Sequence, residues 1–181
     1  GWTPRPHQMA MLAAARAGDS VLLIAPPGGG QTLAGFLPSL VELAADPRPG
    51  LHTLYVSPLK ALATDIARNL TRPVQEMGLA ITIEARTGDT PANRRARQKA
   101  NPPHILLTTP ESLAVLISLP DAPAFFATLR CIVMDEVHAL AGTKRGDQLA
   151  LGVARLRVLA PNARRVGLSA TVAHPDAIQA F

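Results

Sequence analysis

The sequence predicts an α/β fold with a mostly parallel central sheet, and three observations support this. Six short apolar runs recur along the 181 residues. Most of them are apolar throughout rather than alternating, which is typical of strands covered on both faces. Segments with helical spacing or helix-forming composition lie between the runs. Strands that alternate with helices are joined by crossover connections, so we expect one parallel sheet with helices packed on its faces.

The first half of the chain supplies two of the strands. Helix-forming residues over Pro6–Ala17 predict a first helix, and the apolar run Val21–Ala25 predicts the first strand. A glycine cluster separates this strand from Thr32–Ala45, where apolar residues return at helical spacing. The run Thr53–Ser57 predicts the next strand, and Leu59–Met77 has the composition of the helix that follows it.

The second half repeats the pattern with four further apolar runs. Strands are expected at Ala80–Ala85, His104–Thr109, Cys131–Met134 and Arg165–Ser169, and Gln148–Leu159 has helical spacing before the last of them. Three Pro-rich segments should be surface loops rather than domain linkers. These loops are Asp46–Gly50, Asn101–Pro103 and Pro120–Pro123.

Composition and charge exclude several classes of protein. With 48% hydrophobic and 17% charged residues, the chain is neither a disordered tail, nor a collagen-like repeat, nor a small disulfide scaffold. The 18 Lys and Arg residues, most of them Arg, outnumber 13 Asp and Glu and give a net charge of +5. Arg suits bidentate phosphate contacts, so nucleic acid is a candidate partner on charge alone.

The cysteine count and the apolar runs indicate the compartment. Cys131 is the single cysteine, which excludes an intramolecular disulfide and a Cys-based zinc site. No apolar run approaches the roughly 18 residues of a membrane span, and the sequence begins without a signal-peptide pattern. We therefore expect a cytoplasmic domain that makes no membrane contact.

A polar or glycine-containing cluster follows every predicted strand. In a parallel α/β sheet, ligands bind outside the carboxyl ends of the strands, so these clusters should line one edge of the sheet. In chain order they are Pro26–Thr32, Pro58–Leu62, Arg86–Asp89, Thr109–Glu111, Asp135–His138 and Ser169–Thr171.

The first cluster has the composition of a phosphate-binding loop. Glycines allow the backbone to turn tightly and to aim its N–H groups at an anion, and the N-terminus of the following helix adds partial positive charge. Thr32 would offer its hydroxyl to Mg²⁺. The usual signature, G-x-x-x-x-G-K-[ST], is broken at two positions, where Ala25 and Gln31 stand.

Gln31 is the more serious of the two departures. A lysine would place a fixed charge against the β- and γ-phosphates, whereas Gln31 offers only neutral donors. Hydrogen bonds to charged groups, at about 1.5–3 kcal/mol, are roughly twice as strong as neutral ones. The absence of the lysine should slow the reaction at the phosphate roughly 10²–10³-fold, by analogy with the loss of one hydrogen-bond donor to an oxyanion. Pro27 also removes a backbone donor. Taken alone, this segment would fit a glycine-rich turn without a ligand better than a phosphate-binding loop.

Asp135 and Glu136 stand at the end of an apolar run. One carboxylate there can hold Mg²⁺ opposite Thr32, while its neighbour polarises an attacking water. Taken alone, Asp135 and Glu136 would also fit an ordinary pair of solvent-exposed acidic residues at the end of a strand.

Taken in order, the clusters resemble the motifs of the first motor domain of superfamily 2 helicases, the DEAD/DEAH-box relatives. The resemblance spans essentially the whole chain and implies a three-layer RecA-like P-loop fold. Pro58–Ala63, His138–Leu140 and Lys144–Gly146 are most similar to the large helicase-related group. Within that group, the resemblance favours the bacterial ligase-associated DEXH-box helicases of the DNA damage response.

The resemblance also implies the role of each domain and ligand. Residues 1–181 would be the N-terminal, ATP-binding half of a two-domain motor, and a second helicase domain in cis would lie outside them. ATP and Mg²⁺ would be the cofactors. The partner would be nucleic acid, with DNA favoured by the family, held through contacts with the backbone of a single strand.

Individual residues receive roles from the same resemblance. Gln8 is similar to the residue that reads adenine, for which an amide is suited. Ser169 and Thr171 would couple nucleotide state to the grip on nucleic acid, with His138 in the same linkage. The implied catalytic residues are Asp135, Glu136 and His138, with Gln31 at the lysine position. The implied nucleotide contacts are Arg5, Gln8, Pro27, Gly28, Gly29, Gly30, Gln31, Thr32, Ser169 and Thr171, of which Thr32 would share the Mg²⁺ ion with Asp135. The implied nucleic-acid contacts are Pro58, Lys60, Thr87, Gly88, Asp89, Thr109, Pro110 and Glu111.

Two functions remain open at this point. The first is an ATP-dependent helicase or translocase, which the retention of Thr32, Asp135 and Glu136 favours. The second is a pseudo-ATPase that binds nucleic acid without turning over nucleotide, which Gln31 and Pro27 favour. Two basic segments are also open. The run Arg94–Lys99 fits a solvated helix face as well as a DNA contact, and Lys144–Gly146 is expected to be a solvent-facing loop as much as a contact site.

Overall fold

The computed structural model describes residues 3–26 and 29–170. Its six strands form one sheet in which each pairing is parallel, with the order β1-β6-β5-β2-β4-β3. The predicted α/β class is therefore confirmed. The strands are β1 Val21–Ile24, β2 Thr53–Val56, β3 Ile83–Arg86, β4 Ile105–Thr108, β5 Cys131–Met134 and β6 Arg164–Ser169.

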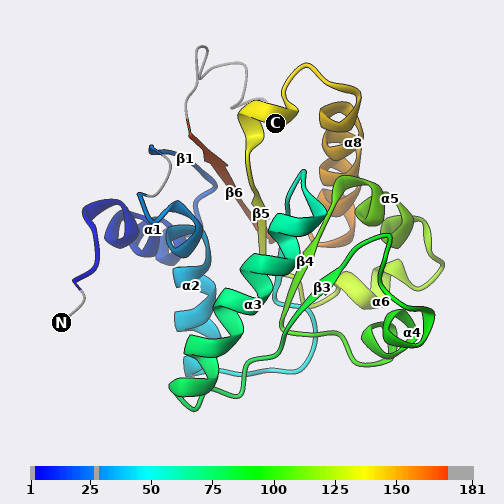
Figure 1. Cartoon of the computed structure of the whole chain (residues 1–181), viewed down its shortest axis with the longest axis horizontal. Coiled ribbons are helices and arrows are strands. Elements are labelled where there is room, and N and C mark those ends of the chain that lie inside the picture. Colours follow the sequence, from blue (N-terminus) through cyan, green and yellow to red (C-terminus); the bar gives the residue numbers. More distant parts are fainter. Residues whose placement is uncertain (1–2, 27–28, 171–181) are drawn as a thin grey trace.

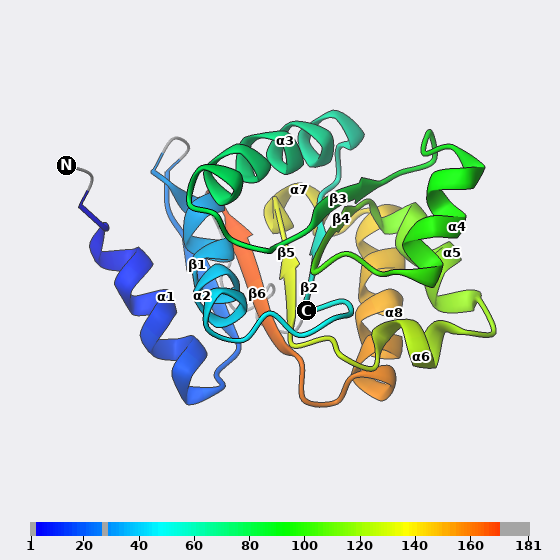
Figure 2. The same ribbon diagram turned by 90° about the horizontal axis from the view of Figure 1, so that it is seen from below.

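Helices occupy the segments between the strands. Three cover one face of the sheet, namely α1 Pro6–Ala17, α2 Gln31–Ala45 and α3 Lys60–Glu76. Four cover the other face, namely α5 Pro110–Ser118, α6 Ala122–Phe126, α7 Val137–Leu140 and α8 Lys144–Leu159 (Figures 1 and 2). The remaining helix, α4 Ala92–Ala100, lies beside the edge strand β3.

The hydrophobic core is divided by the sheet into two clusters. Leu54 and Val56 of β2 pack with α5, α6, α7 and α8, whereas Tyr55 between them packs with α1, α2 and α3. All four residues of β2 are buried, as are those of β4 and β5. Continuous apolar runs indicate strands of this kind, because both of their faces lie against helices.

Three predicted segments differ from the structure by more than one residue at a boundary. The predicted strand Ala80–Ala85 is β3, Ile83–Arg86, since it pairs only with β4 and starts where Ile83 lies opposite Ile105. The predicted loop Pro120–Pro123 contains the start of α6, where Pro123 is tolerated in the first turn.

The third difference concerns the helix predicted at Gln148–Leu159. It begins four residues earlier, at Lys144, because the Thr143 hydroxyl accepts a hydrogen bond of 3.1 Å from the Gly146 N–H and caps the first turn. The expectation of a solvent-facing loop at Lys144–Gly146 was therefore wrong, and this basic segment is helical.

Strand order decides which clusters become neighbours. β6 lies between β1 and β5, with Ile24 opposite Ser169 and Met134 opposite Gly167. The segment after β1, the segment after β5 and the end of β6 consequently meet at the carboxyl edge of the sheet. The segments after β2, β3 and β4 lie together further along this edge.

Candidate functional site

The start of α2 provides an open helix N-terminus. Gly30 precedes the helix with φ 79°, in the left-handed region that favours glycine, and α2 has no side-chain cap. A Cβ on Gly30 would lie 2.9 Å from Nε2 of Gln8, and one on Gly29 would lie 2.8 Å from the carbonyl oxygen of Pro26. Both positions therefore require glycine, and the uncapped N–H groups remain available to an anion. Pro27 and Gly28 of this predicted loop lie outside the described residues.

Gln8 connects α1 to this loop. Its side chain is only 2% exposed. Its Oε1 accepts a hydrogen bond of 2.9 Å from the Arg5 N–H, and its Nε2 donates one of 3.3 Å to the carbonyl of Gly30. The amide predicted to read adenine is thus held against the last residue of the loop, with the exposed Arg5 side chain alongside.

Gln31 bonds across the sheet edge to the end of β6. Its Nε2 donates a hydrogen bond of 2.6 Å to the carbonyl oxygen of Ser169. The same oxygen accepts the Ala25 N–H at 3.2 Å. The side chain at the lysine position therefore links the glycine loop to the Ser169 segment. Thr32, the next residue of α2, is half-buried, and Thr171 lies outside the described residues.

Asp135 follows β5 and is 7% exposed. The Tyr55 hydroxyl of β2 donates a hydrogen bond to its Oδ2. Burial raises the pKa of Asp135, and the charge of Glu136 acts in the same direction. Burial and the nearby Asp135 also raise the pKa of Tyr55, which keeps this phenol protonated as a donor. Tyr55 in turn stacks on Phe36 at 4.8 Å between ring centroids, which fixes its position.

Glu136, His138 and Ser169 form a chain of contacts. Glu136 has φ 51°, the one positive φ among the described non-glycine residues. His138 Nε2 lies 3.2 Å from the Glu136 carboxylate, and its Nδ1 lies 3.1 Å from the Ser169 hydroxyl. Because Nδ1 also accepts the Ala170 N–H at 3.4 Å, a neutral ring would carry its proton on Nε2 and donate it to Glu136. The segments after β5 and β6 are joined by this ring.

The predicted nucleic-acid residues gather around a groove of about 410 Å³ further along the edge. Five of them line it, namely Lys60, Thr87, Gly88, Thr109 and Glu111. Asp89 pairs with Lys60 Nζ at 3.1 Å. The N–H of Thr87 donates to the Thr90 hydroxyl at 2.9 Å, which closes the turn after β3. Pro110 is the buried first residue of α5, and Thr109 caps that helix.

Arg145, in the first turn of α8, connects two of these segments. Its guanidinium binds both carboxylate oxygens of Glu111, at 2.5 and 3.2 Å, and donates to the carbonyl of Pro58 at 2.6 Å. This pairing lowers the pKa of Glu111. A bidentate fork with a third hydrogen bond fixes the start of α5 relative to the segment before α3.

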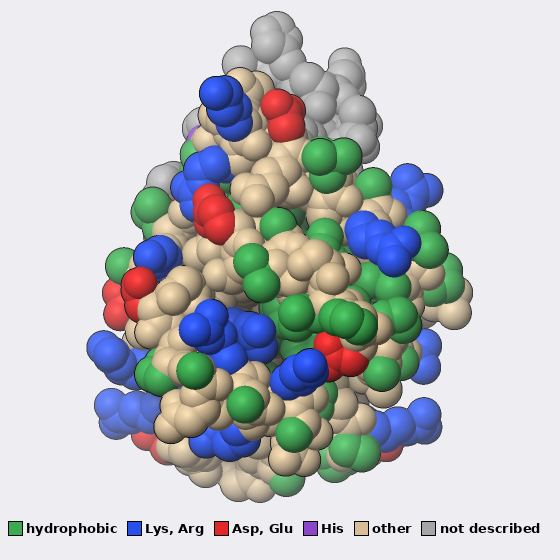
Figure 3. Space-filling model, turned by 90° about the vertical axis from the view of Figure 1, so that its right-hand side faces the viewer, with side chains coloured by type: hydrophobic (Ala, Val, Ile, Leu, Met, Phe, Trp, Pro, Cys, Tyr) green, Lys and Arg blue, Asp and Glu red, His purple; other side chains and the backbone are tan. Residues whose placement is uncertain are grey.

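Four residues outside the predicted list of site residues also help to build the site. Arg86, Arg95 and Arg145 line the groove, and Tyr55 holds Asp135. Arg86 could have been assigned to the site, since it is the first residue of the cluster Arg86–Asp89. Tyr55 carries no such signal, because only the pairing of β2 with β5 brings it to Asp135. Figure 3 looks onto the side of the molecule where α4, α5, α6 and α8 lie, and Lys and Arg side chains are spread over much of it.

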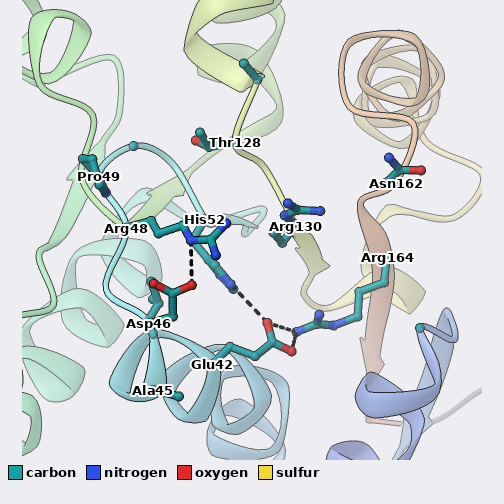
Figure 4. Close-up of a pocket in the computed structure, with 14 residues that line it drawn as sticks. Glu42, Ala45, Asp46, Arg48, Pro49, His52, Thr128, Arg130, Asn162 and Arg164 are labelled. Atoms are coloured by element: carbon teal, nitrogen blue, oxygen red, sulfur yellow. Dashed lines mark hydrogen bonds and ion pairs between the residues drawn. The ribbon is translucent and has the colours of Figure 1, made fainter.

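A larger hollow, of about 620 Å³, lies at the opposite edge. It is lined by residues that precede β1, β2, β5 and β6, so it is away from the predicted motifs. All of its charged side chains except Arg130 pair with each other, as Figure 4 shows: Glu42 binds Arg164 at 2.9 Å and His52 at 3.1 Å, and Arg48 binds Asp46 at 2.6 Å. Self-compensated charge does not indicate a ligand site.

Two other kinds of feature are missing from residues 3–26 and 29–170. None of their helices has the length and apolar character that a membrane crossing needs. They also contain no group of three or more His, Cys, Asp and Glu side chains that could hold a metal ion. A metal at Asp135 would therefore need further ligands, such as hydroxyls and phosphates.

Comparison with known proteins decides the family. Residues 5–179 match the family profile described as DEAD/DEAH box helicase. This chain belongs to the DEAD/DEAH box helicase family. The predicted RecA-like motor fold is confirmed, since this DEAD/DEAH box domain superimposes on the Lhr helicase of Mycobacterium smegmatis bound to ssDNA and AMP-PNP. The TM-score is 0.87 with 46% identity, over 99% of this chain and 24% of the other.

Other relatives place the domain within a longer type of protein. It is 45% identical to the Lhr helicase/probable uracil glycosylase of Mycolicibacterium smegmatis, over 98% of this chain and 13% of that protein. It is 42% identical to the Lhr helicase/uracil glycosylase of Escherichia coli, over 90% of this chain and 12% of that protein. These relatives confirm the predicted resemblance to the large helicase-related group. The DEAD/DEAH box domain thus spans about an eighth of their length, and the ligase-associated subgroup stays a prediction.

Proposed function

We propose that this domain is the nucleotide-binding half of an ATP-dependent motor that moves along single-stranded DNA, together with a second helicase domain in cis. The observation that carries the proposal is the position of Ser169. Its carbonyl accepts from Gln31 of the glycine loop, and its hydroxyl contacts His138, which reaches Glu136. A movement of the glycine loop would therefore be transmitted through these hydrogen bonds to Asp135 and Glu136 and to β6.

The nucleotide side supports ATP as the ligand. The open N-terminus of α2 suits the phosphates, and the amide of Gln8 beside Gly30 suits adenine. Thr32 and Asp135 fit Mg²⁺, because hydroxyl and carboxylate oxygens are the ligands that this ion prefers alongside phosphates and water. The buried carboxylate of Asp135 would gain compensation from a cation. When bound, the ion would neutralise charge on the transferred phosphate.

Glu136 is the residue placed to orient the attacking water. Its carboxylate is partly exposed and is held by His138, so it can accept a proton from a water on the nucleotide side. The second domain would supply the arginine that stabilises charge on the γ-phosphate. We therefore expect slow hydrolysis by the isolated domain.

The groove side supports DNA as the partner. The segments after β2, β3 and β4 line the groove with Lys60, Gly88 and threonine side chains, a set that suits a phosphate backbone without reading bases. The similar Lhr structure is bound to ssDNA and AMP-PNP, and a structure of the helicase MrfA, 28% identical with a TM-score of 0.84, is bound to DNA and AMPPNP.

The alternative function is a pseudo-ATPase that binds DNA. The bond from Gln31 to the Ser169 carbonyl favours it, because this amide is engaged within the protein rather than free for a phosphate. Asp135, Glu136 and His138 favour the motor, because all three keep an arrangement suited to hydrolysis.

The test compares ATP hydrolysis by the native sequence and by Gln31→Lys, each with DNA and with the second helicase domain of a similar Lhr protein supplied. We expect Gln31→Lys to hydrolyse ATP roughly 10²–10³ faster, since it restores a charge where the transition state develops one. Gln31→Ala is the control, because it breaks the bond to Ser169 without adding charge. Equal rates for the native sequence and Gln31→Lys would show that Gln31 is no impairment. No hydrolysis by any variant, with ATP still bound, would favour the pseudo-ATPase.

A further inference from the structure

Two arginines lie together in the groove without an acidic partner. Arg86 ends β3 and is 7% exposed, and its Nη1 donates a hydrogen bond of 3.3 Å to the carbonyl of Arg95 on α4. Both side chains line the groove. Across the described part of the chain, no ion pair joins either of them to a carboxylate, although α4 carries three other basic side chains that are all paired.

The pairing of those three neighbours makes the contrast clear. Arg94 and Arg97 both bind Glu84, at 3.2 and 2.8 Å, and Lys99 binds Asp121 at 3.0 Å. These three basic side chains of α4 are therefore compensated by carboxylates, and none of them lines the groove.

Burial of a guanidinium without a counterion is costly. Burial and the charge of Arg95 both lower the pKa of Arg86, and the charge of Asp121 opposes them with a smaller effect. The other charged side chains at the groove already have partners, Lys60 with Asp89 and Glu111 with Arg145. The Arg86–Arg95 pair is thus a local excess of positive charge that an anion in the groove would relieve.

We propose that Arg86 and Arg95 form a seat for one phosphate of the bound DNA strand, an inference that rests on the proposed function. Guanidinium groups suit the geometry of a phosphodiester. Thr109 and Ser112 also line the groove, and their hydroxyl groups lie 3.3 Å apart. At Gly88, an added Cβ would meet only the flexible end of Lys60, at 3.6 Å, so a strand could approach the backbone there.

In this proposal, Arg95 contacts the DNA strand directly, and Arg94 supplies a matched control. Both residues lie on α4 and both carry one charge, but Arg94 is paired with Glu84 outside the groove. The experiment measures binding of a short oligo(dT) to the 181-residue chain by fluorescence anisotropy over a range of salt concentrations.

We expect Arg95→Gln to weaken oligo(dT) binding about tenfold at low salt, as for the loss of a charged hydrogen bond. The slope of log K against log salt should fall by about 0.7, the value for one phosphate contact on a single strand. Arg94→Gln should change the affinity by less than about twofold. Arg95→Gln should also leave the melting temperature unchanged or higher, because it removes repulsion from the buried Arg86.

Three results would overturn the seat. The first is an unchanged affinity and salt slope in Arg95→Gln while Lys60→Gln weakens binding, which would leave the proposed function intact. The second is equal weakening by Arg94→Gln and Arg95→Gln, which would mean a general effect of charge. The third is competition by a polyglutamate peptide as strong as that by oligo(dT), which would assign the pair to a carboxylate partner. Absence of oligo(dT) binding by the native sequence would overturn both the seat and the proposed function.

Discussion

At the residue scale, Gln31 has a structural partner as well as a chemical deficit. Its neutral amide lacks the charge that a triphosphate requires, but it joins the glycine loop to Ser169 at 2.6 Å. A lysine at this position would have to give up that bond to reach a phosphate, or reach the phosphate only when the loop moves. Replacing Gln31 with Lys would therefore affect the contact between the glycine loop and β6 as well as ATP hydrolysis.

Glu42 carries the first stability prediction at this scale. It holds Arg164, whose side chain is 9% exposed, together with His52 (Figure 4). Glu42→Gln should lower the free energy of unfolding by about 2 kcal/mol at pH 7. This is less than the 3–5 kcal/mol of a fully buried pair, because Glu42 is partly solvated. Urea denaturation would measure the change.

The loss at Glu42 should depend on pH with a defined sign. Burial would raise the pKa of Glu42, but hydrogen bonds from His52 and Arg164 outweigh it and lower that pKa. A carboxyl whose pKa is lowered on folding stabilises the fold above its unfolded value, and the contribution is lost as the pH falls through the folded value. The difference between Glu42→Gln and the native chain should therefore disappear in acid. A loss that stays constant with pH would mean that shape, not charge, accounts for it.

At the element scale, Arg145 shows how helices set the geometry of the predicted DNA groove. It joins α8 to α5 through Glu111 and to the segment before α3 through Pro58. Because these segments follow β2 and β4, the relative position of two predicted contact segments depends on a helix that belongs to neither of them.

A double-mutant cycle tests this connection. Arg145→Ala and Glu111→Ala should show a coupling energy of about 1 kcal/mol, at the upper end for partly exposed pairs, since the fork is bidentate. Arg145→Lys should recover less than half of it, because an ammonium cannot make both contacts. Arg155→Ala, elsewhere on α8, should show no coupling to Glu111. Additive effects of Arg145→Ala and Glu111→Ala would exclude the connection.

The first turn of α8 gives a second prediction at the element scale. A Cβ on Gly146 would overlap the carbonyl oxygen of Leu140. Gly146→Ala should therefore destabilise the fold by about 1–3 kcal/mol, measured by thermal or urea unfolding. Gly88→Ala is the control, since its Cβ would meet only the end of Lys60, and it should change stability by less than about 0.5 kcal/mol. Equal effects of the two substitutions would contradict the packing argument.

At the scale of the whole molecule, the predicted nucleotide residues and the groove share the carboxyl edge of one sheet. Three strands carry the nucleotide side and three carry the groove side. The relatives that this domain matches are several times longer. The proposed movement along DNA would therefore require the longer protein, in which this domain would bind ATP and make some of the contacts with DNA.

The character of the groove leads to a prediction about base sequence. Its lining consists of charged side chains, hydroxyl groups and one exposed Val115, without an aromatic side chain on which a base could stack. Single strands of dT, dC and dA should therefore bind within about threefold of one another, and affinity should fall linearly with salt on logarithmic axes. Titration of each strand at two salt concentrations would measure this. A strong preference for one base would contradict backbone recognition.

Much of the fold and part of the site could be predicted from the sequence. The apolar runs, the glycine cluster and the polar residues after each strand are local features, and they led to the parallel sheet and to its functional edge. The position of α8 could not be predicted as well, because its start depends on a hydrogen bond between Thr143 and Gly146 rather than on hydrophobic spacing. The charged helix α4 has little apolar periodicity and buries only Gln98.

The fold class, the family and the order of the predicted functional segments follow from the amino-acid sequence alone, because each depends on residues close together in the chain. Which of these segments touch depends on the tertiary structure. Gln31 meets Ser169 across 138 positions, Tyr55 meets Asp135 across 80, and Arg145 meets Glu111 across 34. Arg86 lies beside Arg95 because β3 and α4 pack at the sheet edge. These contacts follow from strand order and helix packing, which no local pattern of residues specifies.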